Sequence, residues 1–351
     1  MAEGGVDKGA HPSDYFWERL PEMETKRLYA ACGVHDNRLY VVGGADGMGK
    51  GMDVAEVLHL PTKKWQTLPN APNKRIGCNS VVFFDNKMAL IGGTGDKHDP
   101  IAEIDVLNLE TNQWEHMPPL PMGIVKPFVI LVGRNIYMFG GSTTGTKPLN
   151  RVACFNIDKY EWSPLPDMPT ARYCMDGYLH GNKLYLVGGR SGKTAIPALE
   201  CYDIEAKTWE SLPPFPHNKT FYSVVGHNNN IFVIGGIDPK KGVVKTVDRF
   251  SISERQWIKV PPVFSARADF AAGVIGGRVV CAAGIGSERL KPLDEGETIN
   301  NTYKKWQRIP NMRQARASVS SCIHDGKLYM VGGAGEGGPQ CLVEVLQVRK
   351  E

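Results

Sequence analysis

The chain has 351 residues, with 41 Lys and Arg against 37 Asp and Glu, a formal net charge of +4 and 42% hydrophobic residues. This charge is too small to indicate a nucleic-acid-binding protein, and no apolar run reaches the roughly 18 residues that a membrane span needs. The N-terminal segment lacks the apolar core of a secretory signal, and the eight cysteines form no C-x-x-C pair. We therefore expect a cytoplasmic protein with reduced thiols that binds neither nucleic acid nor membrane.

One sequence unit occurs seven times. Each copy begins with a tryptophan, has a proline four residues later, and continues into an alternating apolar run that ends in a glycine pair. The tryptophans recur every 47 to 49 residues, at Trp17, Trp65, Trp114, Trp162, Trp209, Trp257 and Trp306. The glycine pairs begin at Gly43, Gly92, Gly140, Gly188, Gly235 and Gly332, and the remaining copy reads Ala283-Gly284. A repeat of this length fixes the architecture.

The copy that starts at Trp162 shows what one unit predicts. Residues 173–180 and 183–187 are short runs separated by Gly181-Asn182, which indicates a β-hairpin. Residues 199–204 predict a third strand, and Trp209 lies on a fourth, which the proline at 213 ends. A single four-stranded sheet cannot bury both of its faces, so we expect the seven sheets to stack radially with the tryptophans between them.

These features resemble kelch repeats. The resemblance rests on the glycine pairs, on the spaced tryptophan and on a tyrosine three residues before the pair in four copies (Tyr40, Tyr137, Tyr185 and Tyr329). It implies an all-β fold, a seven-bladed kelch β-propeller with four antiparallel strands per blade. Residues 267–273, running on to 277–280, look similar to stand-alone proteins of the kelch domain-containing protein 8 type. No BTB or BACK region is matched.

We expect residues 1–14 to form a disordered N-terminal tail and residues 15–351 a single propeller. In chain order the predicted blades are 26–68, 74–117, 123–165, 171–212, 218–260, 266–309 and 315–348. The last blade lacks its own tryptophan strand, and residues 15–20 form an unmatched strand of that kind. The N-terminal strand is therefore predicted to complete the last blade and to remove an open sheet edge.

The residue ten positions after the tryptophan is basic in six of the seven copies: Arg27, Arg75, Arg172, Lys219, Arg267 and Arg316, with Ile124 as the exception. Two interpretations stay open. The six could form a positive rim at the mouth of the channel that binds an acidic or phosphorylated peptide or a C-terminal carboxylate. They could instead bond neighbouring backbone carbonyls. In related kelch adaptors, similarly placed arginines contact acidic peptides and others are structural. Arg190, Ser142 and Thr94, which directly follow glycine pairs, are further candidate contacts.

The favoured function is a non-enzymatic, monomeric protein–protein interaction module with no cofactor, binding a protein or peptide partner of acidic character. No metal is expected, because His35, His180, His227 and His324 fall at hairpin turns of separate blades. The alternatives are a substrate-recognition subunit of a ubiquitin ligase, a kelch-type enzyme such as a copper oxidase, and an actin-binding protein.

Overall fold

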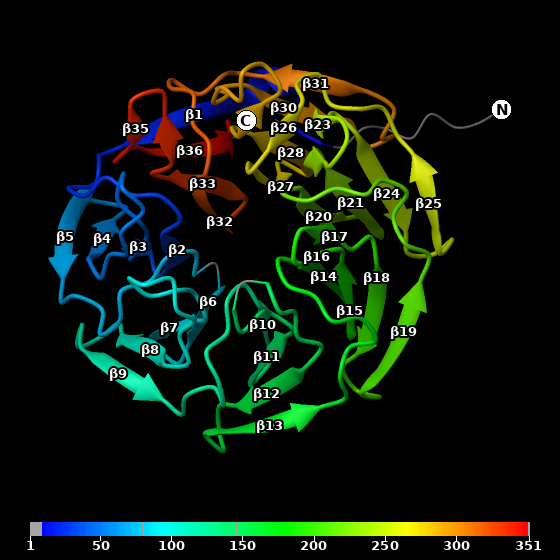
Figure 1. Cartoon of the computed structure of the whole chain (residues 1–351). Helices are drawn as coiled ribbons and strands as arrows, with labels where there is room; N and C mark the ends of the chain where they lie inside the picture. The colour runs from blue at the N-terminus through cyan, green and yellow to red at the C-terminus, as the bar shows by residue number, and fades with distance from the viewer. Residues whose placement is uncertain (1–8, 79, 145, 350–351) are drawn as a thin grey trace. The chain divides into compact units, whose positions relative to one another are not determined.

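The computed structural model describes residues 9–78, 80–144 and 146–349. The described residues form seven sheets of four antiparallel strands and four small two-stranded sheets, which confirms the predicted seven-bladed β-propeller (Figure 1). The chain divides into two compact units, Met23–Pro214 and Met1–Glu22 with Phe215–Glu351.

The unit Met23–Pro214 contains four blades. In each, the first strand lies on the inner side and the fourth, which bears the tryptophan, lies on the outer side (Figure 1). The strands of blades one and two are β2 Ala31–His35, β3 Arg38–Val42, β4 Ala55–His59, β5 Lys64–Leu68, β6 Ser80–Phe84, β7 Lys87–Ile91, β8 Ile104–Asn108 and β9 Trp114–Met117. Those of blades three and four are β10 Phe128–Val132, β11 Asn135–Phe139, β12 Val152–Asn156, β13 Glu161–Leu165, β14 Asp176–His180, β15 Lys183–Val187, β18 Leu199–Asp203 and β19 Thr208–Leu212.

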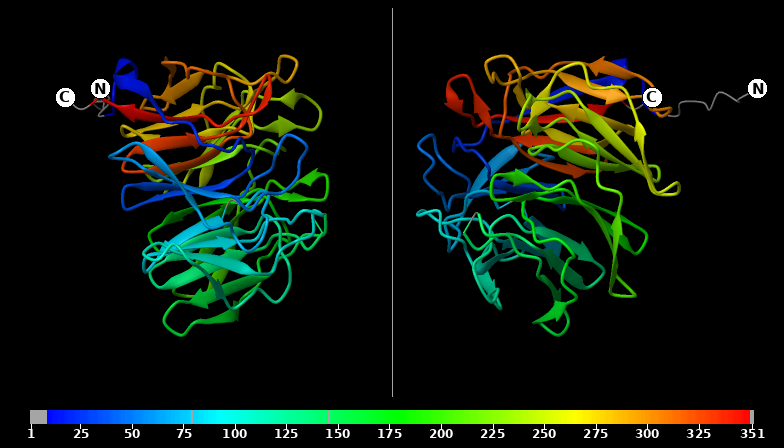
Figure 2. Two further views of the ribbon diagram at one scale, coloured as in Figure 1. Left: turned by 90° about the vertical axis from the view of Figure 1, so that its left-hand side faces the viewer. Right: turned by 45° about the vertical axis from the view of Figure 1, so that its right-hand side comes forward.

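The other unit contains three blades, and its last blade is closed by the N-terminal strand. Strand β1 (Tyr15–Leu20) pairs along its length with β36 (Val343–Val348), and Figure 2 shows the two side by side in blue and red. The remaining strands of its four-stranded sheets are β20 Ser223–His227, β21 Asn230–Ile234, β24 Val247–Ser251, β25 Gln256–Lys259, β27 Ala271–Ile275, β28 Arg278–Ala282, β30 Gly296–Ile299, β31 Trp306–Ile309, β32 Ser320–His324 and β33 Lys327–Val331. The predicted closure of blade seven is therefore confirmed.

The expectation of a disordered tail over 1–14 is wrong for its described part. Residues Pro12–Asp14 form a 3-10 turn in which Pro12 is buried, and the N–H of Ala10 donates to the carbonyl of Gly276 at 2.8 Å. These contacts fix residues 9–14 against blade six. Residues 1–8 lie outside the described residues.

Within each unit, tryptophans link a blade to the one before it. The indole N–H groups of Trp114, Trp162 and Trp209 donate to the carbonyls of Pro69, Pro118 and Pro166 at 2.7–3.0 Å. In the other unit Trp17 and Trp306 donate in the same way to Pro310 and Pro261. The repeated Trp and Pro therefore serve a single inter-blade hydrogen bond, while the apolar second strands of the blades form the buried core between neighbouring sheets.

The first residue of every glycine pair has a positive φ, which favours glycine. A Cβ atom at Gly140 would lie 2.5 Å from the carbonyl oxygen of Arg172 in the next blade. Blade six has Ala283 at this position, with φ of 65°, and its side chain is fully buried. This alanine is thus held in a conformation that its Cβ disfavours.

Replacing Ala283 with glycine is expected to raise the free energy of unfolding by about 0.5–1 kcal/mol, because relief of the left-handed strain exceeds the entropy that glycine adds to the unfolded chain. Urea denaturation would measure the change. Ala282→Gly is the control. Ala282 is the last residue of β28, and a glycine within a strand should destabilise the protein. A loss of stability in Ala283→Gly would contradict the prediction.

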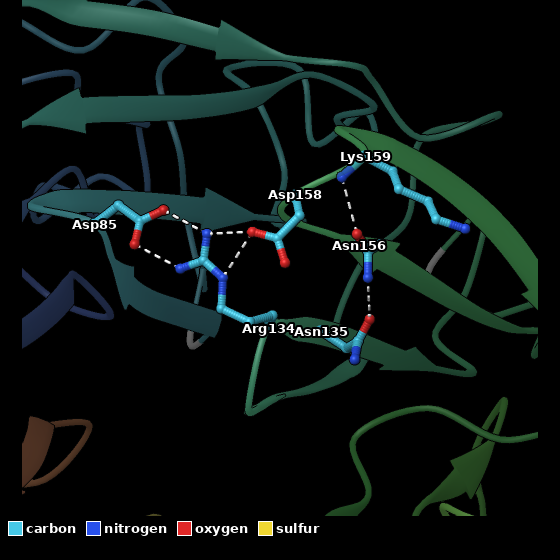
Figure 3. Close-up of polar contacts among 6 residues, drawn as sticks. All are labelled: Asp85, Arg134, Asn135, Asn156, Asp158 and Lys159. Carbon is cyan, nitrogen blue, oxygen red and sulfur yellow. Dashed lines mark hydrogen bonds and ion pairs between the residues drawn. The ribbon is translucent and has the colours of Figure 1, made fainter.

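A surface ion-pair cluster joins blades two and three at the turns between strands (Figure 3). The guanidinium of Arg134 donates to both carboxylate oxygens of Asp85 at 2.6 and 2.9 Å, and to Asp158 at 2.7 Å. The hydrogen bond from Arg134 holds the pKa of the Asp85 carboxyl below its usual range. Asp85 comes from the β6–β7 turn, so Arg134 connects two blades.

We expect Arg134→Met to lower the stability at neutral pH and the deficit to fade as the solution is acidified. The folded pKa of Asp85 is depressed, so its stabilising contribution is complete above the unfolded value of about 3.9 and is lost as the pH falls through the folded value. Urea midpoints at pH 7 and pH 3 would test this. The control Lys159→Met removes a neighbouring exposed charge (Figure 3), and a deficit in Arg134→Met that is as large at pH 3 as at pH 7 would refute the mechanism.

Candidate functional site

The six repeated basic side chains lie inside their blades and not on a rim. Each is at most 2% exposed: Arg27, Arg75, Arg172, Lys219, Arg267 and Arg316. The expected positive rim at a channel mouth is therefore wrong for these side chains. They could reach a peptide only by leaving buried ion pairs, and the structural interpretation fits their positions.

Arg172 shows the geometry of these sites. One terminal nitrogen donates to the carbonyls of Gly188 and Ala198 at 3.0 and 3.1 Å, and the other donates to the carboxylate of Glu200 at 2.7 Å. The first carbonyl belongs to the glycine pair and the second precedes the third strand. The guanidinium thus ties the second and third strands of one blade together.

The same arrangement recurs in both units. The pairs are Arg27–Glu56, Arg75–Asp105, Arg172–Glu200, Lys219–Asp248, Arg267–Glu297 and Arg316–Glu344. Burial lowers the pKa of Arg27, Arg316 and Lys219, and the paired carboxylate opposes this shift. Buried charges persist only when they are paired and hydrogen-bonded in this way.

The carboxylate partners were missed in the sequence analysis, although a signal for them exists. Each is the second residue of its blade's third strand. Blade three, which has Ile124 in place of the base, has Ala153 in place of the acid. The base and the acid are absent from the same copy, which indicates that the two residues occur as a pair.

Blade five has the one lysine among the six, and its environment differs. The ammonium of Lys219 lies 3.0 Å from Asp248 and donates to the carbonyls of Val233 and Thr246. The second oxygen of Asp248 lies 2.6 Å from Nδ1 of His217, whose side chain is 41% exposed. The buried pair therefore connects to the surface through one imidazole.

Of the three further candidate contacts, Arg190 alone carries a charged group, and this group is partly exposed. Ser142 is buried and its hydroxyl donates to the carbonyl of Lys147 at 2.8 Å, so it is not placed to contact a partner. Thr94 is half-buried between Ile76 and Pro100 in backbone bridges. Arg190 is half-buried, with its guanidinium 5.4 Å from the centroid of the Tyr173 ring and its Nε donating to the carbonyl of Gly192 at 2.9 Å.

A further backbone feature occurs two positions after each of the six bases and after Ile124 in blade three. The residues at these positions all have a positive φ: Tyr29, Gly77, Lys126 and Cys174 in one unit, and Phe221, Asp269 and Ser318 in the other. The N–H of Cys174 donates to the carbonyl of Lys126 at 3.2 Å, and that of Asp269 to Phe221 at 3.1 Å. These backbone bonds thus join pairs of neighbouring blades within each unit. The sequence gives no signal for them, because the seven residue types all differ.

We call the end of a blade that carries the glycine pair its glycine-pair edge, and the end with the turn between the first two strands its hairpin edge. Large exposed apolar side chains gather at the glycine-pair edges. Among the described residues, eight such side chains are exposed, and six of them belong to glycine-pair edges: Tyr29, Met48 and Met122 in one unit, and Phe221, Phe264 and Leu290 in the other. The other two are Tyr160 and Ile323. Exposed apolar side chains are therefore more frequent at the glycine-pair edges than on the rest of the described surface.

Neither a metal site nor a bilayer-spanning helix is found in the described part of the chain. Within residues 9–78, 80–144 and 146–349, no three His, Cys, Asp or Glu side chains are grouped so that they could hold a metal ion. The same residues include no helix with the length and apolarity that crossing a bilayer requires.

Seven four-stranded sheets with a repeated glycine pair, replaced by Ala283-Gly284 in blade six, and a repeated tryptophan define a repeat-built β-propeller. The family model for the KLHDC2/KLHL20/DRC7 Kelch-repeats domain matches residues 128–333, and the Kelch motif matches residues 26–72 and 75–121. The first match alone spans more than half of the chain. The chain belongs to the kelch-repeat family, as its sequence pattern predicted.

Individual relatives match over shorter stretches. Kelch domain-containing protein 8B of Homo sapiens is 34% identical over 109 residues, which are 30% of this chain and 30% of that protein. The F-box/kelch-repeat protein At1g74510 of Arabidopsis thaliana is 33% identical over 95 residues, 27% of this chain and 21% of that protein. The solved structure of YjhT superimposes with a TM-score of 0.61 at 16% identity and covers 95% of this chain and 97% of that chain, which supports the fold alone.

Proposed function

We propose that this chain is a non-enzymatic protein-interaction module that holds a protein partner at the glycine-pair edges of its blades and acts in the cytoplasm. The kelch propeller supports an interaction role in general terms. Fold alone does not assign a partner, so the proposal rests on the surface. The eight cysteines are all free thiols, which suits a reducing compartment.

The observation that favours this surface is the concentration of exposed apolar side chains at the glycine-pair edges. Phe221 is 45% exposed and Leu290 is 65% exposed, and both lie at these edges in one unit. Phe221 also has a left-handed backbone, which is costly for a bulky residue and is concentrated at functional sites in proteins. Aromatic and large apolar side chains are enriched where protein surfaces associate.

The proposal is tested by quantitative pull-down from cell lysate with the full chain. The test variant combines Phe221→Ser with Leu290→Ser. The matched control is Ile323→Ser, which removes an exposed apolar side chain (47%) from the first strand of blade seven. Specific partners should be lost with the test variant and retained with the control, once both proteins are shown to melt like the wild type. Recovery of the same partners by all three proteins would overturn the proposal.

The other functions remain predictions. The F-box/kelch-repeat relatives match over only 21–22% of their length in the two longest alignments, so the similarity does not support a ubiquitin-ligase role for this chain. Cosedimentation with actin filaments would test the cytoskeletal alternative, and metal analysis of the purified protein would test the copper-oxidase alternative.

A further inference from the structure

The glycine-pair edges of blades three and four carry more basic residues than acidic ones, which are Asp167 and Asp176. The segments 122–127, 142–151, 170–175 and 190–198 contain no Asp or Glu. Their basic residues other than the buried Arg172 are Lys126, Lys147, Arg151, Arg190 and Lys193, which we call the basic surface. All except the half-buried Arg190 are exposed. The corresponding segments of blades one and two mix both signs, with Asp46 and Lys50 in one and Asp96 and Lys97 in the other.

Three basic side chains elsewhere in the described residues are paired with carboxylates. Lys74 lies 3.0 Å from Asp96, Lys87 lies 2.5 Å from Glu115, and Arg308 lies 3.3 Å from Glu295. Lys126, Lys147 and Lys193 have no such carboxylate within the described residues. These three lysines therefore contribute positive charge that no neighbouring carboxylate neutralises, and they attract anions.

The loops that form this surface lie next to each other. The N–H of Cys174 in blade four donates to the carbonyl of Lys126 in blade three at 3.2 Å. A Cβ atom on Gly192 would lie 4.0 Å from the carbonyl oxygen of Thr146. Both Lys126 and Arg190 are close enough to Cys174 for their charges to act on its thiol. The cations of the two blades can therefore act on one ligand.

Arg190 is held in place before any ligand binds. Its ring contact with Tyr173 and its Nε bond to Gly192 fix the plane of the guanidinium, and the Tyr173 hydroxyl donates to the same carbonyl at 3.0 Å. A fixed planar guanidinium loses little conformational entropy on binding and suits oxyanions with two acceptor oxygens. The flexible lysines around it supply additional positive charge.

We propose that the basic surface binds a phosphorylated serine or threonine segment of a protein partner. A phosphoryl group carries nearly two negative charges and three acceptor oxygens, which match several clustered cations better than a single carboxylate does. The loops also present hydroxyls at Thr144, Thr146 and Ser191 that can donate to those oxygens. The surface covers only two blades, which suits a short segment. This inference rests on the proposed function and specifies one element of it.

The test uses a fluorescent degenerate peptide library with a fixed central phosphoserine, together with matched libraries that have serine or glutamate at the centre. Fluorescence anisotropy with the full chain should show binding to the phosphoserine library at least about tenfold tighter than to either control library. Equal binding to the glutamate library would overturn the proposal in favour of a generally acidic ligand. Complete competition by a single-stranded oligonucleotide at equal charge would overturn it in favour of a nucleic acid.

Two variants locate the site. Lys126→Gln with Lys193→Gln should weaken phosphopeptide binding about tenfold and reduce its dependence on salt. The control, Lys159→Gln with Lys183→Gln, removes the same charge from the hairpin edges of the same two blades and should leave binding within about twofold. Equal loss in both variants would overturn the assignment. Loss of lysate partners in the Phe221 and Leu290 variant with no phosphopeptide binding would retain the proposed function and reject this inference.

Discussion

Replacing Arg172 with isoleucine is expected to lower the free energy of unfolding by about 3–5 kcal/mol, the cost of removing one partner of a buried ion pair. The Glu200 side chain is 2% exposed and would remain in the interior without its counter-charge. The carbonyls of Gly188 and Ala198 would also lose their donor. Urea denaturation followed by tryptophan fluorescence would measure the loss.

The control combines Arg172→Ile with Glu200→Ala and so reproduces the Ile124 and Ala153 of blade three. Removing both charges takes away the unpaired carboxylate, so this double variant should recover at least half of the lost stability. A double variant as unstable as the single one would show that the unpaired carboxylate is not the cause.

Deleting residues 1–22 is expected to destabilise the protein by more than about 5 kcal/mol, because it removes a complete strand and its buried anchors. Tyr15 is fully buried and its hydroxyl donates to the carbonyl of Ile275 at 2.8 Å, while Trp17 donates to Pro310. Strand β36 would also lose the partner of its outer edge. Thermal unfolding of the truncated chain would show the effect.

A synthetic peptide of residues 9–22, added to the truncated chain, should restore the melting temperature in a concentration-dependent way. A variant peptide with Tyr15→Ala and Trp17→Ala should fail to do so. The expectation would be wrong if the truncated chain melted at the temperature of the full chain.

Much of the fold follows from the sequence, because a strand that is ambiguous in one copy of the repeat can be assigned from its aligned positions in the other six. The predicted N-terminal strand 15–20 matches β1, and the third strand predicted over 199–204 matches β18 within one residue. The first strand of blade four was predicted from residue 173 but begins at Asp176. Tyr173 bridges instead to Arg190, and Cys174 has a left-handed backbone that interrupts the strand. An alternating apolar pattern does not predict a residue with a left-handed backbone that interrupts the strand.

The candidate site was less predictable. A base repeated at a fixed position fits a ligand-binding rim and an internal ion pair equally well, and its burial depends on where the third strand places a carboxylate. The sequence shows that blade three lacks both the base, at Ile124, and the acid, at Ala153. This coincidence favours the internal ion pair. By contrast, the basic surface depends on which loops of neighbouring blades meet, as Lys126 and Cys174 do, and this is a tertiary property.

The pairing of β1 with β36 also has a mechanical consequence. Tyr15 lies opposite Val348, so the two chain ends leave this ladder at the same end. A force that pulls the termini apart would load the hydrogen bonds between β1 and β36 in the unzipping geometry, one after another. It would not load them in the shear geometry, in which all bonds bear the force together. Strand β1 closes blade seven at equilibrium, yet it should be the first strand to detach under tension. Stretching the molecule by its ends should therefore release β1 at low force before any other strand.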